Sequence, residues 1–374
     1  MNGTDVGHGF HQYTLTNPLK VVLEVPEHYH IKKWHGHNRS QGHMYEATNI
    51  NSGQKCVIIK QQSVFADLHD AQRVLWEIKM LTSLNHENLL TIIDVLPVRD
   101  PSTFEDVYAV MPYLDVTLSH VLRSKQILSD EHCQYFVYQI LRGLKYLHSA
   151  GLFHGALRPS NVHLNQNCDL RIGDIGVCKF CCSTDDDDDD FVDDGYVAMR
   201  WYDSPETLLG DRSRRAPAGD VWACGCILAE MVLRRPLFPG RDYLDQIKRI
   251  WAVVGPHAEE EEGWIRNPHA VKYIKSLPKP PPKCWASAVP GHTPLALSLL
   301  DKMLVFNPSK RPSVPLLLAH SYLSSCHDPS DEPEALRPLK PPVSRPMTQE
   351  ELRSALWEEM VAFLPHPNQP PRRH

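Results

Sequence analysis

The chain has 374 residues, which is long enough for two packed lobes or domains, each with a sizeable core. A hydrophobic fraction of 42%, a charged fraction of 22% and a formal net charge of -6 give no reason to expect a nucleic-acid or membrane partner. No apolar run is long enough to span a bilayer, and Met1–Tyr13 lacks the apolar centre of a secretory signal. We therefore expect the 10 cysteines to be free thiols in a reducing compartment, the cytoplasm or the nucleus.

Short strand-like runs dominate the first hundred residues, among them Val21–Leu23 and Cys56–Ile59. Between Ala66 and Leu84, apolar residues recur at helical spacing, which predicts a helix. The apolar run Val107–Met111 predicts a strand that ends at the following proline. This part of the chain therefore predicts a small lobe rich in strands.

From Leu118 onward the pattern becomes mostly helical. Cys133–Leu147 is amphipathic, and Val221–Val232 is apolar enough for a buried helix. Thr348–Phe363 opens with a threonine that has Glu351 three residues later, the spacing of a capping box, which predicts a late helix. The whole order predicts an α+β fold with a strand-rich lobe followed by a larger helical lobe.

The run from Tyr146 to Asn161, YLHSAGLFHGALRPSN, resembles the catalytic loop of eukaryotic protein kinases. Other landmarks of that family follow in the expected order. They are a third-strand lysine motif (Val57-Ile58-Ile59-Lys60), a helix glutamate (Glu77), an Asp-Phe-Gly-like triplet (Asp174-Ile175-Gly176) and an Ala-Pro-Glu-like triplet (Ser204-Pro205-Glu206). The last two are the aspartate that begins a buried helix (Asp220) and the arginine that family members pair with the glutamate of the Ala-Pro-Glu motif (Arg311). So many ordered matches over roughly 300 residues imply the bilobal protein kinase fold, in which Glu206, Asp220 and Arg311 are structural.

Three further stretches are similar to the mitogen-activated protein (MAP) kinases of the CMGC group. They are Gly195–Tyr202, Leu237–Tyr243 and His327–Pro333. The resemblance implies an N-terminal extension over residues 1–24 and a kinase-like domain over 25–322, with an N-lobe at 25–111 and a C-lobe at 115–322. Residues 323–374 would then form a docking segment and a MAP-kinase-type C-terminal extension with a helix near 348–363.

The resemblance also implies an ATP site, although in degenerate form. A protein kinase holds the phosphates and Mg²⁺ in place and orients the attacking hydroxyl with a base. The nucleotide-binding positions correspond to Gly36, Gly42, Lys60, Glu77 and Leu114, and the two Mg²⁺ positions to Asn161 and Asp174.

The position of the catalytic base holds Ala156, whose methyl group cannot accept a proton. Beside it, Arg158 stands at the catalytic-loop lysine position and Gly155 at that of an arginine. Ile58 and His163 stand where the family has smaller or more apolar walls around adenine. We therefore predict weak binding of ATP and Mg²⁺, no intact catalytic residue, and a pseudokinase rather than an enzyme.

The activation lip differs as well. The Thr-x-Tyr of MAP kinases corresponds to Asp194-Gly195-Tyr196, and two of the arginines that receive the lip phosphates correspond to Arg73 and Arg200. The other receiver positions hold Gly155, Trp76, Lys179 and Asp203. We predict a lip that does not depend on double phosphorylation. The nearby tract Asp185–Asp190 has three readings: a solvated insertion, a lure for a basic partner segment, or a divalent-ion site without the spacing of a Ca²⁺ loop.

Asp328 and Asp331 match the acidic common-docking site of MAP kinases, which binds basic linear motifs. The plainer alternative is a capped, solvated loop. The auxiliary acidic site holds the neutral residues Gln166 and Asn167. The resemblance thus implies partners from a MAP kinase cascade: upstream kinases, phosphatases or substrates with basic docking motifs.

Together these patterns predict a scaffold, decoy or allosteric partner in a kinase cascade. Two alternatives stay open. Positioning and metal electrostatics supply much of phosphoryl-transfer catalysis, so the retained Lys60, Glu77, Asn161 and Asp174 also fit a residually or atypically active serine/threonine kinase that uses ATP. The other alternative is a folded copy without a selected role.

Overall fold

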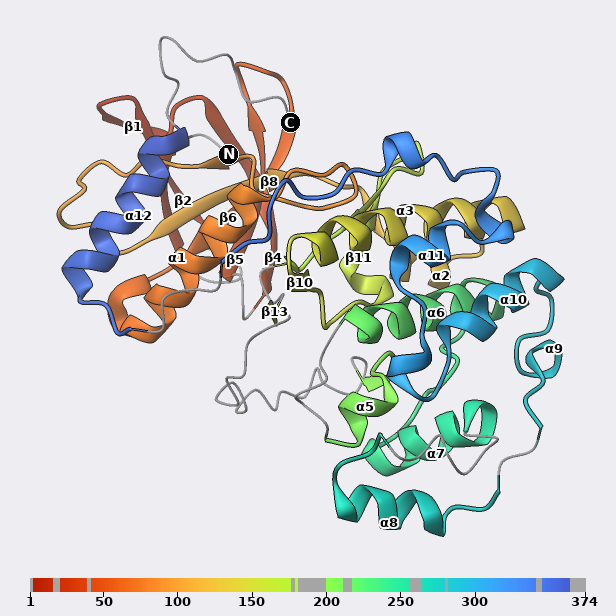
Figure 1. Ribbon diagram of the computed structural model, residues 1–374. Helices are drawn as coiled ribbons and strands as arrows, with labels where there is room; N and C mark the ends of the chain where they lie inside the picture. Colours follow the sequence, from red (N-terminus) through yellow and green to blue (C-terminus); the bar gives the residue numbers. More distant parts are fainter. Residues whose placement is uncertain are drawn as a thin grey trace. The chain divides into compact units, whose positions relative to one another are not determined.

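A computed structural model (Figure 1) describes residues 3–15, 21–38, 42–175, 179–180, 200–210, 217–255, 264–279, 282–340 and 345–363. The chain divides into two compact units. Unit 1 consists of Met1–Asn85, Leu90–Tyr113 and Pro342–His374, and unit 2 consists of His86–Leu89 and Leu114–Pro341. Within the described ranges, no helix combines the length and apolar character that a membrane crossing requires.

Unit 1 is built on a five-stranded antiparallel sheet with the order β4-β5-β6-β8-β7. Its strands are β4 (Tyr29–Asn38), β5 (Gly42–Asn49), β6 (Lys55–Gln61), β7 (Asp94–Val95) and β8 (Val107–Pro112). The predicted strands at Cys56–Ile59 and Val107–Met111 are therefore confirmed as parts of β6 and β8.

A second, three-stranded sheet covers one face of the first. It consists of β1 (Thr4–Gly7), β2 (Phe10–Leu15) and β3 (Val21–Pro26). In β3, Val21, Leu23 and Val25 are buried while Val22 is exposed, as the two-residue period of a strand requires. These side chains form one apolar cluster with Tyr45, Ile58, Tyr108 and Val110 of the larger sheet.

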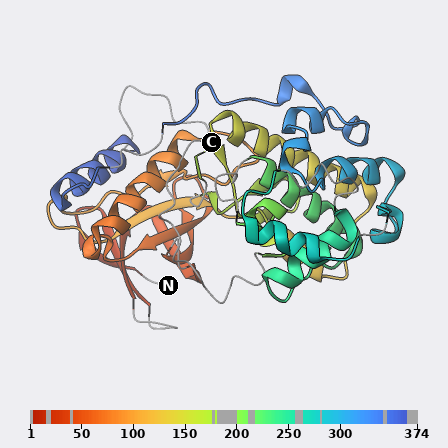
Figure 2. The same cartoon turned by 60° about the horizontal axis from the view of Figure 1, so that its bottom comes forward.

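Two helices complete unit 1 and lie alongside each other in both views (Figures 1 and 2). Helix α1 (Leu68–Ser83) is N-capped by Asp67 and follows the short η1 (Val64–Ala66). Helix α12 (Gln349–Phe363) begins with the predicted capping box: Glu351 N–H donates to Thr348 Oγ1 (3.2 Å), and Thr348 N–H donates to Glu351 Oε2 (2.8 Å). Both predicted helices are confirmed.

Unit 2 is helical and packs around α3 (Asp130–Ser149) and α6 (Pro217–Leu233). Helix α6 is almost entirely buried, as its continuous apolar run predicts. The other helices are α2 (Leu118–Arg123), α5 (Pro205–Leu208), α7 (Tyr243–Val254), α8 (Pro268–Ser276), α9 (Trp285–Ala288), α10 (Pro294–Met303) and α11 (Val314–Leu318), with η2 (Pro159–Asn161), η6 (Pro308–Lys310), η7 (Ser321–Leu323) and η8 (Pro329–Asp331).

Short strands of unit 2 hold the loops beside these helices. They are β9 (Val116–Thr117), β10 (Leu152–Phe153), β11 (Val162–Leu164), β12 (Leu170–Ile172) and β13 (Lys179–Phe180). Strand β10 pairs with β13, and β11 lies between β12 and β9. The predicted order of a strand-rich unit and a helical unit is confirmed.

Candidate functional site

The loop that follows β10 is held in place by Asp220, at the start of α6. The Asp220 carboxylate accepts hydrogen bonds from the backbone N–H groups of His154 (2.8 Å) and Gly155 (2.9 Å), and His148 Nε2 lies 2.9 Å from it. Burial alone would raise the pKa of Asp220. The hydrogen bond and charge of His148, the charge of His154 and the Gly155 N–H outweigh burial, so the pKa is lowered. A buried carboxylate thus fixes the backbone on which the site is built.

Gly155 occupies the position at which the resemblance expects an arginine. Its φ of +71° lies in the left-handed region, and a Cβ there would lie 3.3 Å from the ring of Phe153. The backbone conformation of this loop therefore favours the glycine that the sequence supplies.

Ala156 follows in the loop, and its backbone contacts both His154 and Asn161. Its N–H donates to His154 Nδ1 (3.2 Å), and its carbonyl accepts from Asn161 Nδ2 (3.0 Å). The methyl side chain adds no acceptor of its own. Arg158 follows with an extended backbone and leads into η2.

Asn161 and Asp174 lie side by side, with Asn161 Nδ2 3.2 Å from Asp174 Oδ2. Two contacts fix the backbone beside this pair: Gly173 N–H donates to the Asn161 carbonyl (2.7 Å), and the side-chain nitrogen His154 Nε2 lies 2.8 Å from the Gly173 carbonyl. Asp174 has a φ of 59°, a left-handed conformation that aspartate tolerates better than most residues and that is common at functional sites.

The donor set of this pair fits Mg²⁺. A carboxylate and an amide oxygen are hard ligands, and Mg²⁺ takes only a few protein ligands and fills the rest of its shell with water and phosphate oxygens. Among the residues that the structure describes, no group of three or more histidine, cysteine, aspartate and glutamate side chains could hold a metal by itself. Asn161 and Asp174 would therefore hold the ion together with a nucleotide.

The residues expected to bind the nucleotide are spread over several elements of the chain. Gly36 and Gly42 lie on the hairpin of β4 and β5, where Gly36 faces Met44. Gly42 has a φ of +87°, and a Cβ there would lie 2.4 Å from the Lys60 carbonyl, so this close approach requires glycine. Leu114 lies in unit 2 and is half-buried.

Lys60 and Glu77 are not joined by an ion pair in the described part of unit 1. Lys60 Nζ lies 2.6 Å from Asp106 Oδ2 and donates to the Val22 carbonyl (2.6 Å). Glu77 is buried on α1 and lies 3.8 Å from Arg73. Ile58, expected beside adenine, is fully buried between the two sheets.

The residues of the lip are only partly described, since Asp194, Tyr196, Gly176 and the tract Asp185–Asp190 lie outside the described residues. Arg200 is buried. Its guanidinium carbon lies 4.4 Å from the ring centre of Tyr243, and its Nη1 donates to the Arg241 carbonyl (3.2 Å). The start of α7 thus already engages this arginine.

Glu206 and Arg311 form a buried bidentate ion pair with two distances of 2.7 Å. Arg311 also donates to the Val305 and Ala218 carbonyls and lies over the ring of Trp222. Each nitrogen of the guanidinium therefore has an acceptor, and the pair ties α5 to the segment before α11.

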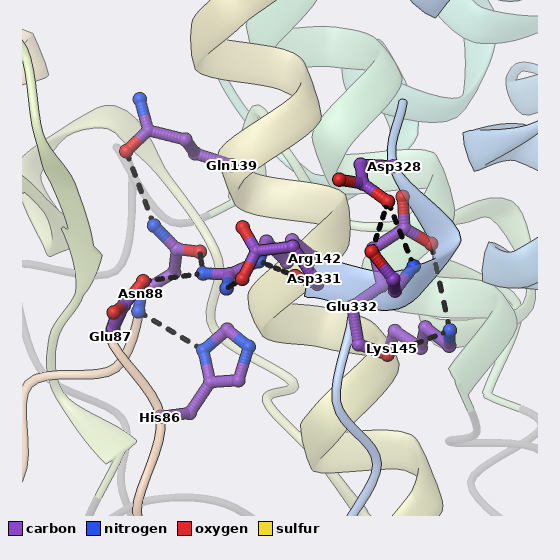
Figure 3. Close-up of polar contacts among 10 residues, drawn as sticks. His86, Glu87, Asn88, Gln139, Arg142, Lys145, Asp328, Asp331 and Glu332 are labelled. Carbon is purple, nitrogen blue, oxygen red and sulfur yellow. Dashed lines mark hydrogen bonds and ion pairs between the residues drawn. The ribbon is translucent and has the colours of Figure 1, made fainter. Parts of the chain in front are cut away.

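The second functional candidate is the acidic cluster in Figure 3. Arg142 of α3 is almost fully buried and pairs with Asp331 Oδ1 (2.9 Å), Glu87 Oε2 (3.0 Å) and Asn88 Oδ1 (2.9 Å). The side chains of Glu87 and Asp331 are 81% and 67% exposed, so both retain oxygens that face solvent. Arg142 thus orders two carboxylates without covering them.

Asp328 also lies in this cluster, and it caps η8. Its Oδ1 accepts from the Ser330 hydroxyl (2.6 Å) and the Ser330 N–H (2.9 Å), and these two hydrogen bonds, the first above all, lower the pKa of Asp328. Nearby, Lys145 donates to the Glu332 carbonyl (2.9 Å). The sequence predicts Asp328 and Asp331 as docking residues but not the neighbouring Arg142 and Lys145, although their spacing of three residues places them on one face of α3.

Residues 38–323 match the protein kinase domain family. The chain is 41% identical to a mitogen-activated protein kinase homolog, MMK2, of Medicago sativa over 86% of this chain and 85% of the relative. It is 40% identical to mitogen-activated protein kinase 6 of Oryza sativa subsp. japonica over 96% and 95% of the two chains. A third relative, mitogen-activated protein kinase 11 of Arabidopsis thaliana, is 40% identical over 87% of each chain.

These relatives correct one expectation. Proteins about 40% identical over most of the chain bear the names of MAP kinases, so the prediction that this chain is not an enzyme is wrong, and the similarities point to a serine/threonine kinase. The resemblance to MAP kinases, by contrast, is confirmed. Since the kinase domain match spans most of the sequence and most of each relative's length is covered, the chain belongs to the MAP kinase family of protein kinases.

Proposed function

We propose that this chain is an atypical MAP-kinase-type serine/threonine kinase that transfers phosphate from ATP without an aspartate base in its catalytic loop. The observation that carries the proposal is the Asn161–Asp174 pair. The backbone of Gly173 supports it, since its N–H donates to the Asn161 carbonyl and its own carbonyl lies against the ring nitrogen of His154. Phosphoryl transfer depends mainly on positioning and on electrostatic stabilisation by metal ions, so a chain that retains both oxygen ligands for Mg²⁺ side by side retains this part of the site.

Each residue of the loop has a role in this proposal. Asp174 and Asn161 bind Mg²⁺, which neutralises charge on the phosphates when it is bound. Arg158 supplies a second positive charge next to the loop. Asp220 keeps the loop backbone in position through His154 and Gly155.

Ala156 leaves the attacking hydroxyl without an acceptor from the loop. The transition state of phosphoryl transfer is loose, with little bond formation to the attacking oxygen, so transfer does not require early removal of the hydroxyl proton. A positioned base typically contributes ~10²–10⁴-fold. We therefore propose a slow enzyme whose rate depends on the metal ligands.

The test is phosphotransfer from radiolabelled ATP to a basic substrate protein, using the full chain. The matched controls are Asp174→Asn and Glu27→Gln, the latter an exposed carboxylate of unit 1 far from the loop in sequence. We expect incorporation that requires Mg²⁺, survives Glu27→Gln and disappears in Asp174→Asn. Incorporation that is equal in Asp174→Asn and the wild type would refute the proposal, because it would come from a contaminating kinase.

The same protein would recruit its partners through the acidic cluster around Asp328 and Asp331. What supports this is the arrangement of three exposed carboxylates: Glu87 and Asp331 are ordered by Arg142, and Asp328 is held by Ser330. Such a surface suits a basic linear motif from a cascade protein. Fluorescence anisotropy with a labelled Arg/Lys-rich peptide tests it: no binding at low salt would exclude this role.

A further inference from the structure

On strand β6, Lys60 and the following Gln61 lie on opposite faces of the sheet. Side chains alternate along a strand, so Ile58 and Lys60 share one face while Ile59 and Gln61 share the other. Ile58 belongs to the apolar cluster beneath the β1–β3 sheet. Lys60 pairs in register with Tyr108, another member of that cluster, and its Nζ lies 5.6 Å from the centre of the Tyr108 ring.

The ammonium group of Lys60 is fully engaged on this face. It lies 2.6 Å from Asp106 Oδ2 and donates to the carbonyl of Val22, a residue of β3, at 2.6 Å. The other oxygen of Asp106 accepts from the Ser63 N–H (3.0 Å), which holds the turn after β6. The side chain of Lys60 is only 4% exposed, so these partners replace the water that its ammonium group has lost.

The opposite face of β6 meets α1. Ile59 and Gln61 line a small cavity together with Val74, Glu77 and Ile78 of that helix, and with Ala109 and Met111 of β8. Glu77, the helix glutamate expected to hold a lysine, therefore shares its cavity with Gln61.

We propose that Gln61, not Lys60, is the polar residue of β6 on the face toward Glu77, and that Lys60 is a structural tie between the two sheets of unit 1. This proposal rests on the kinase function proposed above, because that function makes ATP the ligand of the site. It implies that the phosphates of ATP are bound without a lysine from this strand. A neutral glutamine cannot offset the negative charge of the phosphates. We therefore expect a low affinity for ATP, and this weakness is independent of the substitutions in the catalytic loop.

Two single variants of the full chain separate the roles. Lys60→Met removes the tie, so we expect a lower melting temperature and an ATP dissociation constant within about twofold of the wild type. Gln61→Lys places a cation opposite Glu77 in the observed register. We expect it to tighten ATP binding about tenfold, equivalent to ~1.4 kcal/mol, with Mg²⁺ present. Isothermal titration calorimetry and thermal unfolding provide both readouts.

Loss of ATP binding in Lys60→Met at an unchanged melting temperature would overturn the proposal, as would a Gln61→Lys variant that binds ATP no better than the wild type. Should Lys60→Met fail to fold, acylation of lysines in the wild type, read by mass spectrometry, replaces it. We expect Lys60 to react equally slowly with and without ATP, and protection by ATP would overturn the assignment. Absence of phosphotransfer, by contrast, would refute the kinase function while leaving these binding and labelling outcomes readable.

Discussion

Arg142 Nη2 donates to Asp331 Oδ1 at 2.9 Å, so one of the two carboxylates of the expected docking site is partly committed within the protein. The side chain of Asp331 nevertheless remains 67% exposed. The two aspartates therefore differ in kind. Asp331 is oriented by a buried guanidinium, whereas Asp328 caps η8 through Ser330.

Asp328→Asn should weaken a basic docking peptide without destabilising the fold. Asparagine caps helices about as well as aspartate, so the bonds to Ser330 survive while the charge is lost. We expect a several-fold higher dissociation constant that depends less steeply on salt, measured by fluorescence anisotropy. Glu27→Gln is the matched control for the loss of one negative charge. Equal affinity of Asp328→Asn and the wild type would contradict the docking role.

Ala156→Asp should accelerate phosphotransfer. The backbone of residue 156 is already held by hydrogen bonds with His154 and Asn161. These bonds do not involve the side chain, so we expect an aspartate at this position to keep them. We expect kcat to rise ~10²–10⁴-fold, the usual contribution of a positioned base. Ala156→Asn, which adds a similar volume without a basic carboxylate, serves as the control. A rate unchanged by Ala156→Asp, at unchanged ATP affinity, would show that another step limits turnover.

His86 should make the protein less stable as the pH falls. Burial, and then the charge of Arg142, lowers the pKa of His86 from 6.5 to about 3. Between these two values the unfolded chain binds a proton that the folded chain does not, so unfolding is favoured as the pH decreases. Above the unfolded pKa of 6.5 the group makes no difference to the pH dependence.

Urea unfolding at pH 7 and pH 5 measures this effect. Each pH unit in the window costs ~1.4 kcal/mol, so His86 alone accounts for about 2 kcal/mol between the two conditions. His86→Asn keeps an acceptor for the Asn88 N–H but does not titrate, and it should lose less stability on acidification than the wild type. The same loss in both proteins would assign the pH dependence to other groups.

The elements with a clear period could be predicted from the sequence. Helix α12 is an example, because Leu352, Leu356 and Met360 repeat every four residues and all three are fully buried. The face of the sheet on which Lys60 lies could not be predicted. The preceding residues Val57, Ile58 and Ile59 point alternately to the two faces of β6 and are all apolar, so they do not distinguish the faces. Likewise, Arg142 draws its partners from residues 87, 88 and 331, which no local pattern connects.

Breaking the Glu206–Arg311 pair should be the most damaging of these changes. Both side chains are almost completely buried, and two 2.7 Å contacts join them. Arg311→Met leaves the Glu206 carboxylate buried without its cation, which typically costs ~3–5 kcal/mol. Chemical denaturation would measure this loss in the single variant.

The double variant Glu206→Gln/Arg311→Met separates the stranded charge from the loss of the pair. Glutamine removes the buried negative charge, so we expect the double variant to recover part of the stability that Arg311→Met loses. It will not recover all of it, because the Val305 and Ala218 carbonyls still lack the guanidinium donors they have in the wild type. If the double variant is no more stable than Arg311→Met, the destabilisation comes from the lost packing over Trp222 and the unpaired carbonyls rather than from the uncompensated carboxylate.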